Sequence, residues 1–94
     1  MSERTVKIAS RTGLHARPAA LFVKAAADQG VPVKIRVGDG KAVPAASMLA
    51  VLALGAQQGT EVTLEAEGAG ADDALDALAA LLARDLDAEE STDA

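Results

Sequence analysis

The chain of 94 residues contains no cysteine and a single histidine, His15. Without cysteine, the protein has no disulfides, no thiolate metal sites and no cysteine nucleophile. A lone histidine also argues against a metal cluster built from histidines. We therefore expect no metal site built from cysteine or histidine side chains.

Aromatic residues are almost absent, because there is one Phe (Phe22) and neither Trp nor Tyr. Half of the residues are hydrophobic, but many of them are Ala, which predicts a thin core with helices packed closely on a sheet. The formal net charge is −5, and the negative residues concentrate after Glu61. Because the chain has neither a basic face nor stacking aromatics, we expect no binding to nucleic acid.

No segment approaches the roughly 18 apolar residues that a membrane span requires, and the N-terminus has no apolar signal core. We therefore expect a soluble, cytoplasmic protein without membrane insertion. The length suits one small domain, which we place at residues 1–87. Residues 88–94 are acidic and lack an apolar period, so we expect a disordered tail.

Four short segments alternate apolar and polar residues, as half-buried strands do. They cover residues 4–9, 33–37, 41–43 and 61–67. Gly38-Asp39-Gly40 predicts a hairpin turn, and Pro44 suits an edge strand or its end.

Three segments have the apolar spacing of helices, at residues 16–28, at 47–54 and from Asp72 onward. Ser47 is suited to cap the second helix. The order β-α-β-β-α-β-α predicts an α+β fold, an open-faced β-sandwich whose four-stranded antiparallel sheet is covered on one face by three helices.

The open face of the sheet is predicted to carry Lys7, Lys34 and Arg36. The fourth strand would turn Glu61, Thr63, Glu65 and Glu67 toward solvent. Arg4, Arg11 and Lys41 are interpreted as solvated surface residues.

Residues 13–19, which read Gly-Leu-His-Ala-Arg-Pro-Ala, lead from the first predicted strand into the first predicted helix. Gly13 permits a sharp turn of the backbone. His15 falls at or near the N-cap position. Pro18 is tolerated in the first helical turn, where its missing N–H has no consequence.

An anion site is therefore predicted at the start of this helix. The N–H groups of Ala16 and Arg17 would face outward, and Arg17 adds a permanent charge whose planar fork suits phosphate oxygens. Neutral imidazole is a good nucleophile near pH 7, since its usual pKa is about 6.5. A lone histidine at a helix start is, however, more often a cap or a surface residue, so residue types alone leave both interpretations open.

Residues 13–19 resemble the active-site motif of HPr, the histidine-containing phosphocarrier of the bacterial sugar phosphotransferase system. The resemblance extends over residues 4–86. It includes Lys41, the segment Ala46-Ser47-Met48, and several short glycine-containing segments.

The resemblance implies a phosphoryl carrier rather than an enzyme, with neither a metal ion nor an organic cofactor in the carrier itself. His15 would accept a phosphoryl group on Nδ1 from enzyme I, which draws on phosphoenolpyruvate, and pass it to enzyme IIA proteins for sugar uptake. Arg17 would contact the phosphoryl group, together with the backbone of Ala16. We expect the carrier to be a monomer.

The same resemblance suggests surfaces for other proteins. The partner-docking surface would comprise Ala20, Lys24, Met48 and Leu49, and an exposed Met is an adaptable contact. Ser47 matches a serine that a dedicated kinase phosphorylates in some relatives. The match is partial, because Ala46 replaces the Lys that many such relatives carry, and helix capping explains Ser47 as well.

Three alternatives remain open at this point. A specialised relative would keep His15 but serve other partners. A regulatory module of the same fold would have lost phosphotransfer, although the presence of both His15 and Arg17 argues against it. A small ligand-binding regulatory domain is disfavoured by the lack of aromatics.

Overall fold

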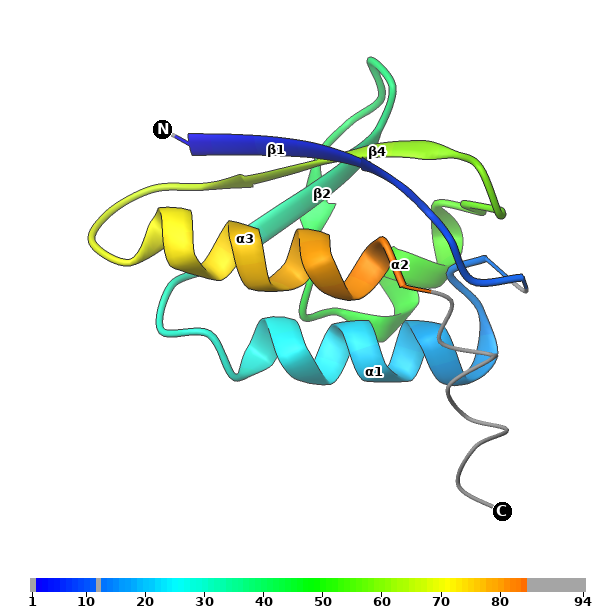
Figure 1. The fold of residues 1–94 in the computed structure, drawn as a ribbon, viewed down its shortest axis with the longest axis horizontal. Helices are drawn as coiled ribbons and strands as arrows, with labels where there is room; N and C mark the ends of the chain where they lie inside the picture. The colour runs from blue at the N-terminus through cyan, green and yellow to red at the C-terminus, as the bar shows by residue number, and fades with distance from the viewer. Residues whose placement is uncertain (1, 12, 85–94) are drawn as a thin grey trace.

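The computed structural model describes residues 2–11 and 13–84 (Figure 1). Its elements follow the predicted order β-α-β-β-α-β-α. They are β1 (Ser2–Lys7), α1 (Ala16–Ala27), β2 (Val33–Val37), β3 (Val43–Pro44), α2 (Met48–Ala53), β4 (Glu61–Ala66) and α3 (Ala71–Leu82). The predicted tail at residues 88–94, like the end of the predicted domain, lies outside the described residues.

The four strands form one antiparallel sheet in the order β1-β4-β2-β3. In this register Val6 pairs with Val62, and Ile35 pairs with Leu64. The three helices all cover the same face of the sheet (Figure 1). The predicted open-faced α+β sandwich is therefore confirmed, and Pro44 ends the edge strand β3 as expected.

The core lies between the helices and the covered face of the sheet. Its largest fully buried side chains include Phe22, Ile35, Leu64 and Leu75. Buried alanines at the helix surfaces allow close approach to the sheet, which is how a chain with one aromatic residue fills its interior. These alanines include Ala19, Ala26, Ala71 and Ala74.

The boundaries of β1, β3 and β4 differ from the prediction, and those of β1 and β3 differ most. β1 ends at Lys7 because its partner β4 begins at Glu61, the residue paired with Lys7. β3 covers only Val43–Pro44, since pairing with β2 begins at the pair Ile35 and Val43. Strand length was set by the available partner, which alternation along one segment does not report.

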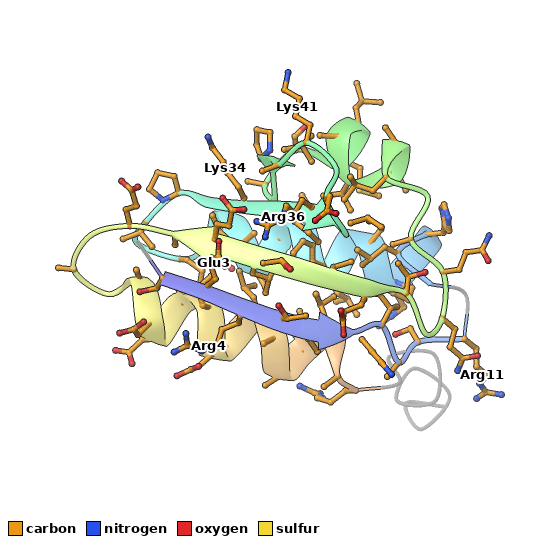
Figure 2. All side chains as sticks on the ribbon, turned by 90° about the horizontal axis from the view of Figure 1, so that it is seen from above. Glu3, Arg4, Arg11, Lys34, Arg36 and Lys41 are labelled. Atoms are coloured by element: carbon orange, nitrogen blue, oxygen red, sulfur yellow. The ribbon has the colours of Figure 1, made fainter. Side chains whose placement is uncertain are left out.

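The open face of the sheet carries Glu3, Lys34 and Arg36 (Figure 2), and some of its charged side chains form ion pairs with one another. Lys7 and Lys34 are exposed as predicted, but Arg36 is half-buried and forms ion pairs with Glu65 and, at 3.6 Å, with Glu3. The prediction that Thr63 faces solvent is wrong.

Thr63 is buried because β4 is a central strand, where Thr5 of β1 and Arg36 of β2 lie on either side of it. Its hydroxyl lies 3.2 Å from that of Thr5, at hydrogen-bond distance. The sheet places the two threonines directly opposite one another. Cross-strand pairs of this kind stabilise a sheet whose face no helix covers.

Arg4 is also more than a solvated surface residue, because it connects β1 to α3. Its Nε donates to the carboxylate of Asp76 at 2.8 Å, and its Nη2 lies 3.5 Å from Asp72. The hydrogen bond to Asp76 is the main cause of a raised pKa of Arg4.

Within the described ranges, no helix has the length and apolar character needed to cross a membrane.

Candidate functional site

His15 occupies the N-cap position of α1, as the sequence predicted. Its backbone is extended, with φ −135° and ψ 166°, and its carbonyl accepts the first helical hydrogen bond from the N–H of Ala19 at 3.4 Å. The imidazole makes no capping hydrogen bond, and the residue is exposed. The side chain at this helix start is therefore presented to solvent instead of being used to stabilise the helix.

The two residues before His15 are held firmly in place. Gly13 adopts a left-handed φ of +71°, which a residue with a Cβ rarely tolerates. The next residue, Leu14, is 1% exposed, and its N–H donates to the carbonyl of Ala56 at 2.9 Å. A buried side chain and a backbone hydrogen bond thus fix the chain directly next to the exposed histidine.

The first turn of α1 has the electrostatic character of an anion site. It contains no acidic residue, so nothing in the helix itself offsets the positive end of the helix dipole. Arg17 is exposed in this turn, while Pro18 is buried and anchors it. The arrangement favours a dianionic group attached to the side chain of His15.

The predicted docking residues lie on α1 and α2, two helices that pack against each other. Ala20 and Lys24 of α1 are exposed. On α2, Leu49 is 82% exposed, whereas Met48 is half-buried and packs against the core. The exposed apolar contact on this helix is therefore Leu49 rather than the Met48 that the sequence favoured.

Ser47 is the N-cap of α2, and its hydroxyl accepts a hydrogen bond from the N–H of Ala50 at 3.3 Å. The residue is half-buried. The capping role that the sequence allowed is thus observed.

The sequence did not reveal that the loop Gly55–Thr60, between α2 and β4, contacts the segment directly before His15. Ala56 contributes only its backbone carbonyl, and every residue type has one. Gly13 was the signal that the sequence offered, because a glycine can mark a place where another backbone approaches closely.

An open-faced β-sandwich with an exposed histidine and an arginine at the start of its first helix defines the class of small phosphocarrier proteins. A family model described as "PTS HPr component phosphorylation site" matches residues 2–84. The chain therefore belongs to the HPr family, the phosphocarrier proteins of the phosphotransferase system (PTS). Members of this family are carriers, not catalysts.

Related proteins and solved structures match nearly the whole chain. The phosphocarrier protein HPr of Streptomyces coelicolor is 54% identical over 87 residues, which cover 93% of this chain and 94% of the relative. A crystal structure of HPr from Thermoanaerobacter tengcongensis superposes with a TM-score of 0.81 at 43% identity, covering 87% of this chain and 91% of that one.

A crystal structure of Crh from Bacillus subtilis, described as a swapped dimer, has a TM-score of 0.67 at 42% identity. It covers 90% of this chain and 97% of that chain. Because a related chain forms a dimer, the monomeric state that we expect for this protein remains a prediction.

Proposed function

We propose that this phosphocarrier accepts a phosphoryl group on His15 from phospho-enzyme I, whose ultimate donor is phosphoenolpyruvate, and transfers it to enzyme IIA proteins. The observation that carries the proposal is the exposed imidazole at the N-cap of α1, which makes no capping hydrogen bond. A side chain in this position that capped the helix would have its polar atom occupied. The imidazole of His15 is instead directed to solvent, where a partner can reach it.

The chemistry requires only a good nucleophile and a site for the transferred charge. The unprotonated ring nitrogen of His15, Nδ1 by family resemblance, attacks phosphorus, and the bond between phosphorus and the donor breaks in the same exchange. The other ring nitrogen keeps its hydrogen, so no further base is needed. In the onward transfer the new N–P bond breaks and the acceptor takes the phosphoryl group.

Arg17 and the start of α1 stabilise the phosphoryl group between these two transfers. The guanidinium offers charge-assisted hydrogen bonds to phosphate oxygens. The N–H groups of Ala16 and Arg17 lie in the first turn, where the helix dipole favours negative charge. Together they hold the dianion without an enclosed active site, which suits a carrier that must pass its group on.

Partners would dock on the surface formed by Ala20, Lys24, Met48 and Leu49. Leu49 supplies an apolar contact that is 82% exposed, and Lys24 adds positive charge on α1, the helix that packs against α2. An apolar centre with neighbouring cations fits an acidic partner surface, because local potential steers association even when the net charge is negative. We propose that the carrier works in the cytoplasm as a monomer.

Ser47 is a separate candidate, for regulatory phosphorylation by a serine kinase. A phosphate at the N-cap of α2 would add negative charge at the positive end of that helix. Its hydroxyl already caps the helix. Phosphorylation would therefore replace a neutral cap by a charged phosphate, next to Met48 and Leu49 in the chain.

The test uses the fact that the chain has one histidine. Incubation with phosphoenolpyruvate and enzyme I should attach one phosphoryl group that survives base and is lost in acid. The variant His15→Ala should acquire none, while its circular dichroism spectrum and thermal unfolding remain close to those of the wild type. An acid-labile label on His15→Ala, or no label on the wild type, would overturn the proposal.

A further inference from the structure

The loop Gly55–Thr60 lies directly against the segment that leads into His15. The carbonyl oxygen of Ala56 accepts the N–H of Leu14 at 2.9 Å. Ala56 is 1% exposed and Leu14 is equally buried. This contact joins the loop to the residue immediately before His15.

Gly13 brings the two backbones into contact. A Cβ at this position would overlap the carbonyl oxygen of Ala56 and would lie 2.7 Å from Cα of Gln57. Such distances are well inside van der Waals contact, so the loop and the segment before His15 touch backbone to backbone. Displacement of Ala56 or Gln57 must therefore displace the segment that carries His15.

Thr60 holds this loop in its observed shape. Its Oγ1 accepts the N–H of Gln57 at 3.0 Å, and its own N–H donates to the carbonyl of Gln57 at 2.9 Å. The carbonyl of Thr60 accepts the N–H of Ile8 at 3.0 Å. Thr60 thereby connects the loop to the point where β1 and β4 end their pairing.

We infer that Thr60 is a positioning residue for phosphotransfer, acting through Gln57 and Ala56 on the backbone that carries His15. The inference rests on the proposed function of His15. Thr60 itself touches no reacting atom, so its effect is on the placement of the imidazole and not on its chemistry. A nucleophile displaced by about 1 Å can lose about 100-fold in rate.

The inference makes a specific kinetic prediction. The docking surface lies on α1 and α2, and the hydrogen bond from Gln57 to Thr60 is part of neither helix. Loosening the loop should therefore reduce the maximal rate of transfer and leave partner binding unchanged. Loss of global stability would move neither quantity at a temperature where the protein is fully folded.

The variant Thr60→Val tests this prediction, because it keeps the branched shape but removes the hydroxyl acceptor. With enzyme I and phosphoenolpyruvate, and with the carrier as the varied substrate, we expect kcat to fall about 10-fold while KM stays within twofold. Thr60→Ser restores an acceptor and should recover most of the rate.

The matched control is Thr63→Val, which removes the hydroxyl contact with Thr5 on the open face of the sheet. It is the same substitution three residues further along the chain, but Thr63 lies in β4 and outside the loop that contacts Gly13. We expect wild-type kcat and KM for this variant. Thermal unfolding of each variant sets a temperature at which both are folded.

Each outcome decides between the two claims. If Thr60→Val transfers at the wild-type rate, or loses rate through KM alone, or slows no more than Thr63→Val does, the positioning role is wrong. If the wild type acquires no acid-labile phosphoryl group, the function proposed for His15 fails first, independently of any Thr60 variant.

Discussion

The helices α1 and α3 have the same length, 12 residues each, but opposite chemistry at their N-termini. α3 starts after Gly70 and places Asp72 and Asp73 in its first turn. α1 starts after His15, has no acidic residue in its first turn and carries Arg17 there. The acidic residues of α3 offset the positive end of its dipole, whereas the positive end of α1 can interact with an anion that is not part of the helix.

The side chains near the N-termini of α3 and α1 differ in the same way. The carboxylate of Asp72 lies 3.5 Å from Arg4, and Asp76 one turn later lies 2.8 Å from the same guanidinium. The acids of α3 therefore fasten β1 to the helix. At α1 the charged side chain is an exposed arginine beside an exposed histidine. The terminus of α3 thus contributes to stability, whereas that of α1 remains available for the phosphoryl transfer that we propose for His15.

The largest effect is expected when α1 is given the charge of α3. In Arg17→Glu, the new carboxylate favours the helix but repels the phosphoryl group. We expect transfer to fall about 100-fold, because about 1.5–3 kcal/mol of charge-assisted hydrogen bonding is lost. The free energy of unfolding should change by less than about 1 kcal/mol, as measured by urea denaturation.

Arg17→Gln is the matched control for this change, since it removes the charge without reversing it. Its transfer rate should lie between those of the wild type and Arg17→Glu. Equal rates for the wild type and both variants would show that the start of α1 does not stabilise the transferred group.

A smaller effect is expected at the N-cap of α2, where the side chain does stabilise its helix. Ser47→Ala removes the acceptor for the N–H of Ala50 and should reduce the free energy of unfolding by about 1 kcal/mol. His15→Ala, at the corresponding position of α1, should change it by less than half as much. Urea denaturation of both variants measures the difference, and similar losses would contradict the absence of a cap at His15.

The smallest effect is expected when the acids of α3 are neutralised. Asp72→Asn together with Asp73→Asn should reduce the free energy of unfolding by about 1 kcal/mol or less at low salt. This loss should shrink in high salt, because screening weakens the interaction of exposed charges with the dipole. Phosphotransfer should be unaffected; a slower transfer would mean that α3 contributes to the site.

The element order, the covered and open faces of the sheet and the placement of His15 at a helix start were predictable from the sequence. Alternation and helical spacing are local patterns, and a glycine before a histidine and a proline after it delimit the first helix within a few residues.

The orientation of α2 was less predictable. Two adjacent apolar residues, Met48 and Leu49, differ in burial only because of how the helix packs on α1 and the core.

By itself, the sequence determined which residues are candidates for the proposed phosphoryl transfer: an imidazole, a guanidinium two residues later and a proline that is tolerated in the first turn of a helix. Only the tertiary structure decided what holds them. The carbonyl of Ala56 and the hydroxyl of Thr60 lie in the loop between α2 and β4, far from His15 in the chain. Backbone groups are the same in every residue, so their partners are set by the approach of strands and loops, which residue types do not report.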